Sequence, residues 1–489
     1  MKKQPFLTGF PTTLFGSAKR SSQARFRSLR NKVTSPHALR DLFREVFPSS
    51  RFDRYQEVPG KRRKRIFTIE TTFWTFLYQA MAQNASLAAA VAQVQAGLSQ
   101  RGAATPSSST GAYSQARQNL PVELLEELHH DTCEKLRRAS CTDDHWRGRT
   151  VKMVDGSSVQ AAGTPENQAV WPQPSEQRKG CGFPVVYVSG LLNWSTGAWE
   201  QWIESDSHHH EAKKMLHLLP SVRKGDVVVA DRAYASYTLM ALHRARGADM
   251  ISRVHQRRHV NWKAGKKLSC PDDRLFTWKR TKRRPASSPL TDEQWEALPR
   301  LLDVRIIRFR YHDRYGKKRS MLVVTTLLDA EAYPAEEIAM LYRQRWDIEL
   351  RLRDLKTTLR MEVLRGKTPE MIRKELMIFA IAFNLLRYLQ SRAANEAEVC
   401  PTRISFKGVL DVIGSIPQAR HRLNSRSKLL DWVLDRIGER VVPLRPDRHE
   451  PRAKKRRPKP HQNLTKHRRE YCEIPHKDHY RKSTTNALI

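Results

Sequence analysis

Two acidic side chains stand directly after short apolar runs that are typical of buried strands. Asp155 follows residues 151–154, and Asp231 follows residues 227–230. Ligand sites in open α/β sheets gather just outside the strand ends, so we expect these two carboxylates to converge. Taken singly, an Asp after a strand is more often a turn former or a helix cap. The pair therefore needs a third element to indicate a catalytic site.

Residues 342–356 supply that element. At about 100° per residue, Tyr342, Arg345, Glu349 and Lys356 fall on one helical stripe about 60° wide. One acid thus lies among three groups suited to binding DNA phosphates. The alternative is a solvated helix face with ordinary ion pairs. A neighbouring apolar stripe, which would anchor the helix to a core, argues against that alternative. This second stripe consists of Leu341, Ile348, Leu352, Leu355 and Leu359.

Three carboxylates suit phosphodiester cleavage. Hard divalent cations take oxygen ligands, and two ions roughly 4 Å apart can activate a nucleophile and stabilise the leaving oxygen. We therefore expect Asp155, Asp231 and Glu349 to be both catalytic residues and metal ligands, with Mg²⁺ as the cofactor and Mn²⁺ as a possible substitute. The run His208, His209, His210 also suggests a metal, but the start of an exposed helix explains it more simply.

The net charge indicates a polyanionic partner. The 489 residues include 88 Lys and Arg against 50 Asp and Glu, a formal charge of +38. No basic amphipathic helix stands alone as a membrane anchor, so double-stranded DNA fits better than a membrane. A ribosome-associated or chromatin-like packing protein is the alternative, but 11 Trp and 39% hydrophobic residues favour a chain with a large core.

Nothing in the sequence indicates export or a zinc site. The six cysteines form no Cys-x-x-Cys pair, which is typical of reduced cytosolic thiols. The first residues lack the apolar run of a signal peptide, and the most apolar stretch, 377–389, is too short to cross a bilayer. We expect a cytoplasmic protein, associated with the bacterial nucleoid.

The N-terminal and C-terminal parts are expected to be helical. Residues 1–140 lack strand-like alternation, and with the basic run 61–65 they predict a helical DNA-binding domain. Residues 396–489 are expected to hold a helical region and then a flexible basic tail. The helices expected in the N-terminal domain cover 71–83, 86–98 and 121–136.

Residues 149–395 predict an α/β catalytic domain. Three strands are followed by alternating helices and strands, the βββαβαβ order of the ribonuclease-H-like fold. An insertion, mostly β, is expected at about 257–320, and a long helical region from Pro334 towards Gly366. The expected strands are 151–154, 183–192, 198–203, 227–230, 250–254 and 321–328, and the expected helices are 209–219, 234–245 and 370–394.

With these motifs in place, the sequence resembles a known family, the bacterial insertion-sequence transposases of the group named for insertion sequence four. The signature of that group is Tyr-(2)-Arg-(3)-Glu-(6)-Lys, and Tyr342, Arg345, Glu349 and Lys356 match it position by position. The sequences around Asp155 (Val-Asp-Gly) and Asp231 (Ala-Asp-Arg-Ala-Tyr) resemble the two Asp motifs of the group. The likeness runs from about residue 105 to the basic tail.

The resemblance implies a cut-and-paste transposase acting on terminal inverted repeats and target DNA as a homodimer on paired ends. It implies cleavage that frees a 3′-hydroxyl, which can form a hairpin on the opposite strand before strand transfer. Tyr342, Arg345 and Lys356 would hold phosphates. Met321 matches, by its spacing to Glu349, the residue that replaces a flipped base in hairpin-forming relatives. The alternatives are a catalytically inactive, transposase-derived DNA-binding regulator and a plain ribonuclease-H-like nuclease.

Overall fold

The computed structural model describes residues 35–55, 66–140, 145–175, 180, 182–206, 211–256, 258–285, 288, 290–312, 317–419 and 425–443. The chain divides into two compact units. The first holds residues 1–135 and 381–443, and the second holds residues 136–380 and 444–489. The basic run 61–65, His208–His210 and the basic tail lie outside the described residues.

The first unit is helical in its described part, as expected. Ser35, Thr68 and Ser86 cap its helices α2, α4 and α5, since each side chain accepts a hydrogen bond from a backbone N–H of the first turn. Aromatic rings, among them Phe47 and Trp74, pack in its core. Its helices are α2 (Pro36–Phe43), α3 (Ser50–Asp53), α4 (Ile69–Met81), α5 (Leu87–Ser99), α6 (Gly111–Gln118), α15 (Phe406–Ala419) and α16 (Arg426–Gly438).

Helices α7 (Val122–Ala139) and α14 (Pro369–Glu396) contribute to both units. The expected boundary after residue 395 therefore differs from the division of the units, which falls within α14 between residues 380 and 381. Within the described part of the chain, α14 and every other helix are too short or too polar to cross a membrane.

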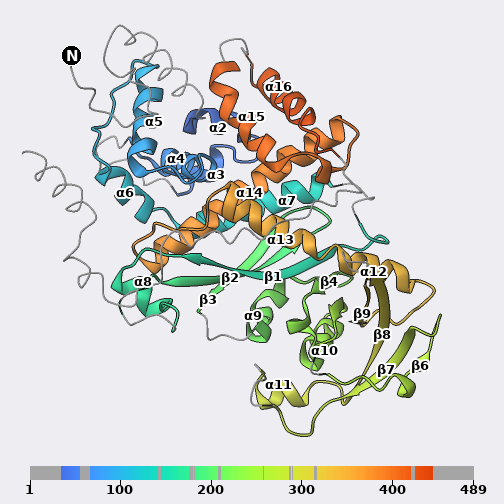
Figure 1. The fold of residues 1–489 in the computed structure, drawn as a ribbon. Coiled ribbons are helices and arrows are strands. Elements are labelled where there is room, and N and C mark those ends of the chain that lie inside the picture. The colour runs from blue at the N-terminus through green and yellow to red at the C-terminus, as the bar shows by residue number, and fades with distance from the viewer. Residues whose placement is uncertain are drawn as a thin grey trace, which may run out of the picture. The chain divides into compact units, whose positions relative to one another are not determined.

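The second unit is built on one mixed sheet with the strand order β3-β2-β1-β4-β5-β9-β8-β7-β6 (Figure 1). In its first part, three strands are followed by alternating helices and strands, as in the expected order, except that the short helix α8 lies between β1 and β2. Strand β1 is antiparallel to β2 and parallel to β4. The inserted strands extend the same sheet, because β9 pairs with β5. The strands are β1 (Val151–Gln160), β2 (Val185–Asn193), β3 (Trp199–Ser205), β4 (Val227–Ala230), β5 (Asp249–Arg253), β6 (Lys266–Lys267), β7 (Asp273–Lys279), β8 (Leu301–His312) and β9 (Lys318–Thr325).

Helices cover both faces of this sheet (Figure 1). Helices α9 (Glu211–Leu218) and α10 (Tyr237–Ala245) pack with Val154 in one apolar cluster. Side chains alternate along a strand, so Asp155 points to the opposite face. On that face α13 (Trp346–Arg353) packs against β1, and α12 (Ala335–Arg343) packs against β5 and β8. The smaller helices are α8 (Pro165–Val170) and α11 (Asp292–Glu296).

Two local predictions are wrong. Asp155 does not stand at a strand end, because β1 continues to Gln160 through its pairing with β2. The helical region from Pro334 is not one regular helix. It breaks at Gln344 and Arg345 between α12 and α13, and continues as a π-helical turn, η5 (Asp354–Thr358), which holds Lys356. The four signature residues therefore do not share one regular helical stripe.

Candidate active site

Asp155 and Asp231 stand on neighbouring parallel strands. Val154 is in register with Ala230, so the next residues lie level, with backbones roughly 5 Å apart. The Asp155 Oδ1 accepts a hydrogen bond from Gly156 N at 2.8 Å, and the Asp231 Oδ1 accepts one from Arg232 N at 2.6 Å. These short local bonds fix one oxygen of each carboxylate.

Glu349 reaches the same place from α13, through Arg345. One guanidinium nitrogen of Arg345 lies 3.1 Å from Glu349 Oε1, and another lies 3.5 Å from Asp155 Oδ2. The indole of Trp194 donates a hydrogen bond to Asp347 Oδ2 at 2.9 Å, which ties the start of α13 to the chain after β2. Asp155 and Glu349, which are far apart in the sequence, thus both contact the guanidinium of Arg345.

Negative charge is concentrated around Asp155. Burial raises the pKa of the Asp155 carboxyl above its usual value, and the nearby carboxylates of Glu349 and Asp231 raise it further. The Gly156 N–H and the Arg345 guanidinium act in the opposite direction. Glu349 and Asp231 therefore both lie within electrostatic range of Asp155.

Tyr342 and Arg345 form the buried rim of the site. Tyr342 is 6% exposed, and burial raises the pKa of its phenol to about 12. Its other charged neighbours include Asp231 and Arg253 at the end of β5. Although burial lowers the pKa of Arg345, Tyr342 and the two aspartates raise it overall, so this guanidinium stays charged.

The other two expected site residues, Lys356 and Met321, stand on η5 and β9. Lys356 is half-buried on η5, three residues after the end of α13. Met321 is half-buried on β9, directly opposite Phe309 of β8. The structure thus gathers Asp155, Asp231, Glu349, Tyr342 and Arg345.

The donor set suits a divalent metal ion. Among the residues that the structure describes, no three acids, cysteines or histidines are arranged closely enough to form a metal site on their own. Asp155 and Glu349 nevertheless converge on a single cationic group. Burial is the main cause of the raised pKa of Asp155, and the carboxylates of Glu349 and Asp231 add to it, so a bound cation would stabilise the charged form of this carboxyl. Carboxylate oxygens are the ligands that Mg²⁺ and Mn²⁺ prefer. The residues therefore fit such an ion.

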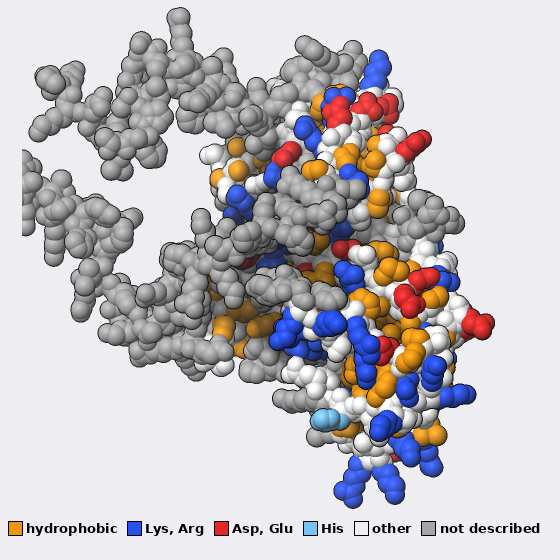
Figure 2. Space-filling model, turned by 45° about the vertical axis from the view of Figure 1, so that its right-hand side comes forward, with side chains coloured by type: hydrophobic (Ala, Val, Ile, Leu, Met, Phe, Trp, Pro, Cys, Tyr) orange, Lys and Arg blue, Asp and Glu red, His pale blue; other side chains and the backbone are white. Residues whose placement is uncertain are grey.

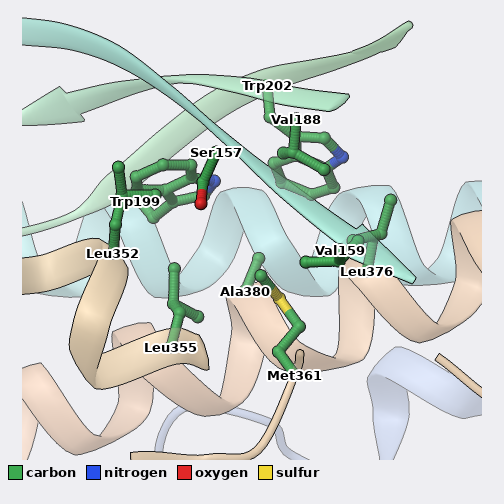
Figure 3. A pocket seen from close by; sticks show the side chains of 10 residues that line it. All are labelled: Ser157, Val159, Val188, Trp199, Trp202, Leu352, Leu355, Met361, Leu376 and Ala380. Atoms are coloured by element: carbon green, nitrogen blue, oxygen red, sulfur yellow. The ribbon is translucent and has the colours of Figure 1, made fainter. Parts of the chain in front are cut away.

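Beside the acids, a small apolar cavity of about 10 Å³ lies between the sheet and the helices that cover this face (Figure 3). Ser157, two residues after Asp155, lines it together with Trp199 and Leu352. The Trp199 ring also covers Gly190, the register partner of Asp155 on β2. A side chain at position 190 would collide with this ring, so glycine is required there.

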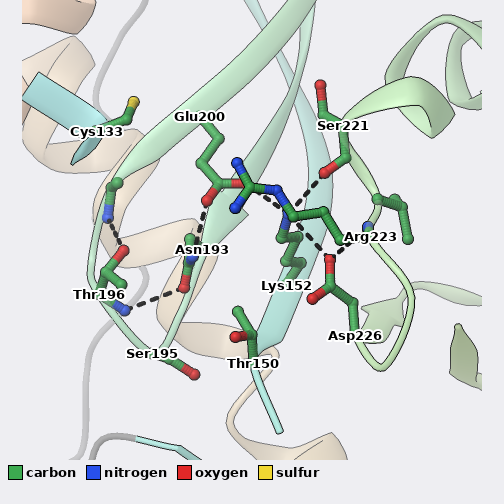
Figure 4. A network of polar contacts seen from close by, with 12 residues as sticks. Cys133, Thr150, Lys152, Asn193, Ser195, Thr196, Glu200, Ser221, Arg223 and Asp226 are labelled. Carbon is green, nitrogen blue, oxygen red and sulfur yellow. Dashed lines mark hydrogen bonds and ion pairs between the residues drawn. The ribbon is translucent and has the colours of Figure 1, made fainter. Parts of the chain in front are cut away.

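The opposite face of β1 is fixed by a buried lysine (Figure 4). Lys152 is 2% exposed, and its Nζ lies 2.8 Å from Glu200 Oε2, 3.0 Å from Asp226 Oδ2 and 2.6 Å from the Ser221 carbonyl oxygen. These contacts link β1 to β3 and to the segment before β4. They hold the strands that carry Asp155 and Asp231 in register.

Sequence analysis missed three residues of this arrangement, namely Arg253, Trp194 and Asp347. Arg253 is the last residue of β5, next to Asp231 after β4, so its position at the end of a strand was an available signal. The bond between Trp194 and Asp347 had no such signal, because 153 positions separate the two residues.

Comparisons with known proteins indicate the family of this chain. A family model described as a transposase DDE domain matches residues 146–385. The chain is 25% identical over 411 residues to the transposase InsG for insertion sequence element IS4 of Escherichia coli, covering 81% of this chain and 87% of that protein. Over 102 residues it is 36% identical to a probable transposase for insertion sequence element IS5377 of Geobacillus stearothermophilus, covering 21% of this chain and 25% of that protein.

Among solved structures, a piggyBac transposase synaptic complex with hairpin DNA covers 86% of this chain and 88% of its own, at 10% identity and a TM-score of 0.39. That score does not define a shared fold. The family model, which spans the sheet and its three acids, places the chain among the DDE transposases. Within them it belongs to the IS4 group, since its likeness to the IS4 transposase extends over most of both chains.

Proposed function

We propose that this chain binds the ends of its own insertion sequence, cleaves the DNA there and joins the ends to a target. One observation carries this proposal. Asp155 and Glu349 meet on the guanidinium of Arg345, while Asp231 stands level with Asp155 on the next strand. The strand order β3-β2-β1-β4-β5 supports assigning the second unit to the ribonuclease-H-like folds.

In the proposed reaction, Asp155, Asp231 and Glu349 hold divalent metal ions, which supply Lewis acidity at the scissile phosphate. A water oxygen bonds to phosphorus as the bond to the 3′-oxygen breaks, which leaves a 3′-hydroxyl and a 5′-phosphate. The oxygen of that hydroxyl then bonds to the phosphorus of a second phosphodiester, in the target or, by way of a hairpin, in the opposite strand. The bond from this phosphorus to its 3′-oxygen breaks, and that oxygen leaves as a new 3′-hydroxyl.

The chain's own cations position the DNA in this proposal. Arg345 is buried against the acids, so it can reach only a phosphate that enters the site itself. Lys356 is more exposed and lies eleven residues after Arg345, on η5, where it can hold a neighbouring phosphate. Such contacts orient the scissile bond without reading base sequence.

We assign DNA binding outside the catalytic centre to the helical first unit, and synapsis to a homodimer on paired ends. The net charge of +38 supports an interface dominated by phosphate contacts. A catalytically inactive DNA-binding regulator would need no cluster of acids on the sheet. The raised pKa of Asp155, caused in part by the other two acids, favours the enzyme.

The test is Glu349→Gln, which keeps the side-chain size and removes the charge. On a DNA fragment that spans one boundary of the element, we expect Mg²⁺-dependent cleavage to be lost while binding stays near that of the wild type. Lys356→Ala should weaken binding in a salt-dependent manner and lower cleavage less.

Asp347→Asn is the matched control. It removes one negative charge from the same helix and keeps an acceptor for the Trp194 indole. This variant should cleave like the wild type. Cleavage by Glu349→Gln at the rate of Asp347→Asn would refute the catalytic role of Glu349.

A further inference from the structure

The last residues of β8 and the first residues of β9 extend beyond the neighbouring strands β7 and β5. β7 pairs with β8 only as far as Ile307, and β5 pairs with β9 only from Val323 onward. Residues 309–312 and 318–321 pair only with each other within the described sheet. They form a two-stranded ribbon, called here the β8–β9 ribbon.

This ribbon projects from the sheet edge that carries the catalytic acids. Ala230 is in register with Ser252 of β5, and Ser252 with Val324 of β9. Asp231, the next residue after Ala230, is therefore level with Arg253 of β5 and with its partner Val323 of β9. The antiparallel β9 places Met321 two residues further out, roughly 7 Å beyond that level.

One face of the ribbon also continues the face of the sheet that holds the active site. Arg253 is in register with Val323, and both Asp231 and Arg253 lie close to Tyr342. Residues two apart on a strand share a face, so Met321 lies on the face of Val323, and Phe309 is its direct partner. Phe309 and Tyr311 therefore belong to the catalytic face.

The side chains on this face suit nucleic acid. The rings of Phe309 and Tyr311 are stacked, with centroids 6.1 Å apart and planes 17° apart. Tyr311 is 39% exposed, and its partner across the ribbon is the exposed Arg319. Aromatic rings that stack on bases beside cations that hold the backbone are the recurring means of binding single strands.

The other face of the ribbon is already engaged. The Arg308 guanidinium lies 4.1 Å from the centre of the Trp262 ring, and an Arg310 nitrogen lies 3.0 Å from Asp272 Oδ1. Figure 2 shows Lys and Arg side chains gathered over the lower end of the molecule, the region where Figure 1 draws α11 and β6–β9. The aromatic face, by contrast, carries the exposed side chains of Tyr311 and Arg319.

We propose that Phe309 and Tyr311 form a stacking site for unpaired bases of the DNA strand that leaves the catalytic centre, with Arg319 on its phosphates. This inference rests on the proposed function, and it assigns a role to two residues outside the signature and the three acids. In the sheet, β8 is three strands from β4, which precedes Asp231, and four strands from β1, which carries Asp155. These separations are about 14 Å and about 19 Å, which a few nucleotides span.

The probes are a blunt duplex and the same duplex with a short unpaired tail, 5′ or 3′, carrying 2-aminopurine. We expect the wild type to bind one tailed form more tightly than the blunt form and to quench its fluorescence. Tyr311→Ala and Phe309→Ala should each lose about ten-fold in affinity for that tailed duplex and lose the quenching, while blunt-duplex binding persists. Tyr311→Phe should behave like the wild type, because it keeps the ring.

Leu301→Ala is the control. Leu301 is 57% exposed on the same face of β8 but at the other end of the strand, eight residues from Phe309. It should leave both binding and quenching unchanged. If Tyr311→Ala binds and quenches the tailed duplex like the wild type, the stacking site is refuted while the proposed function stands. If the wild type binds neither duplex, the stacking site and the proposed function are both refuted.

Discussion

His243 provides a pH-dependent test of how the second unit is stabilised. It is fully buried on α10, on the face of the sheet opposite the acids, and its Nδ1 lies 2.7 Å from the Leu239 carbonyl oxygen. Among the residues that the structure describes, none forms a hydrogen bond with its Nε2, so protonation would bury an unsatisfied N–H. Burial lowers the pKa of His243 from 6.5 to about 4.

The sign and size of the effect follow from linkage. Because the folded pKa is depressed, the unfolded chain binds more protons between pH 4 and 6.5, and stability falls as pH decreases through that window. The free energy of unfolding should fall by about 2 kcal/mol between about pH 7 and about pH 5, towards a limit of about 3 kcal/mol.

The assay is urea unfolding of the wild type and His243→Gln, followed by tryptophan fluorescence across that pH range. The glutamine keeps a donor for the Leu239 carbonyl group and does not titrate. We expect the wild type to lose more stability than the variant on acidification, so that the difference between their free energies of unfolding changes by about 2 kcal/mol. Parallel loss in the two proteins would refute the reasoning.

Two further predictions concern the strands that carry the acids. Gly190→Ala places a Cβ 1.8 Å from Trp199 Cζ2, so it should destabilise the second unit by about 1–3 kcal/mol in urea unfolding, and adding Trp199→Leu should recover part of the loss. If Gly190→Ala is as stable as the wild type, the Trp199 ring moves aside without cost. Lys152→Met leaves the carboxylates of Glu200 and Asp226 without the ammonium group that they share. The free energy of unfolding should fall by about 3 kcal/mol in the same assay. A fall of less than about 1 kcal/mol would mean that these ion pairs contribute little to stability.

Much of the catalytic unit was predictable from local patterns. The run 227–230 is β4 at the expected bounds, since four consecutive buried apolar residues fit a central strand. The pairing of Arg345 with Glu349 follows from their spacing of four residues on a helix. These features depend on near neighbours in the chain.

Features set by distant contacts were not predictable. The sequence after Asp155, Gly-Ser-Ser, is typical of a turn, but β2 pairs with it and keeps it extended. Arg345 contacts Asp155 where the helix breaks, and Asp347 bonds to Trp194, so tertiary contacts define the start of α13. The face of the β8–β9 ribbon likewise required the register of four strands, which no single segment encodes.

The most direct test of the central claim is the metal specificity of cleavage by Asp231→Cys. A thiolate is a poor ligand for Mg²⁺ and a better one for the softer Mn²⁺. If Asp231 holds a metal ion at the centre it shares with Asp155 and Glu349, the variant should fail to cleave element-end DNA in Mg²⁺ and recover cleavage in Mn²⁺, with DNA binding unchanged in both. Cleavage in Mg²⁺ at the wild-type rate would contradict the account.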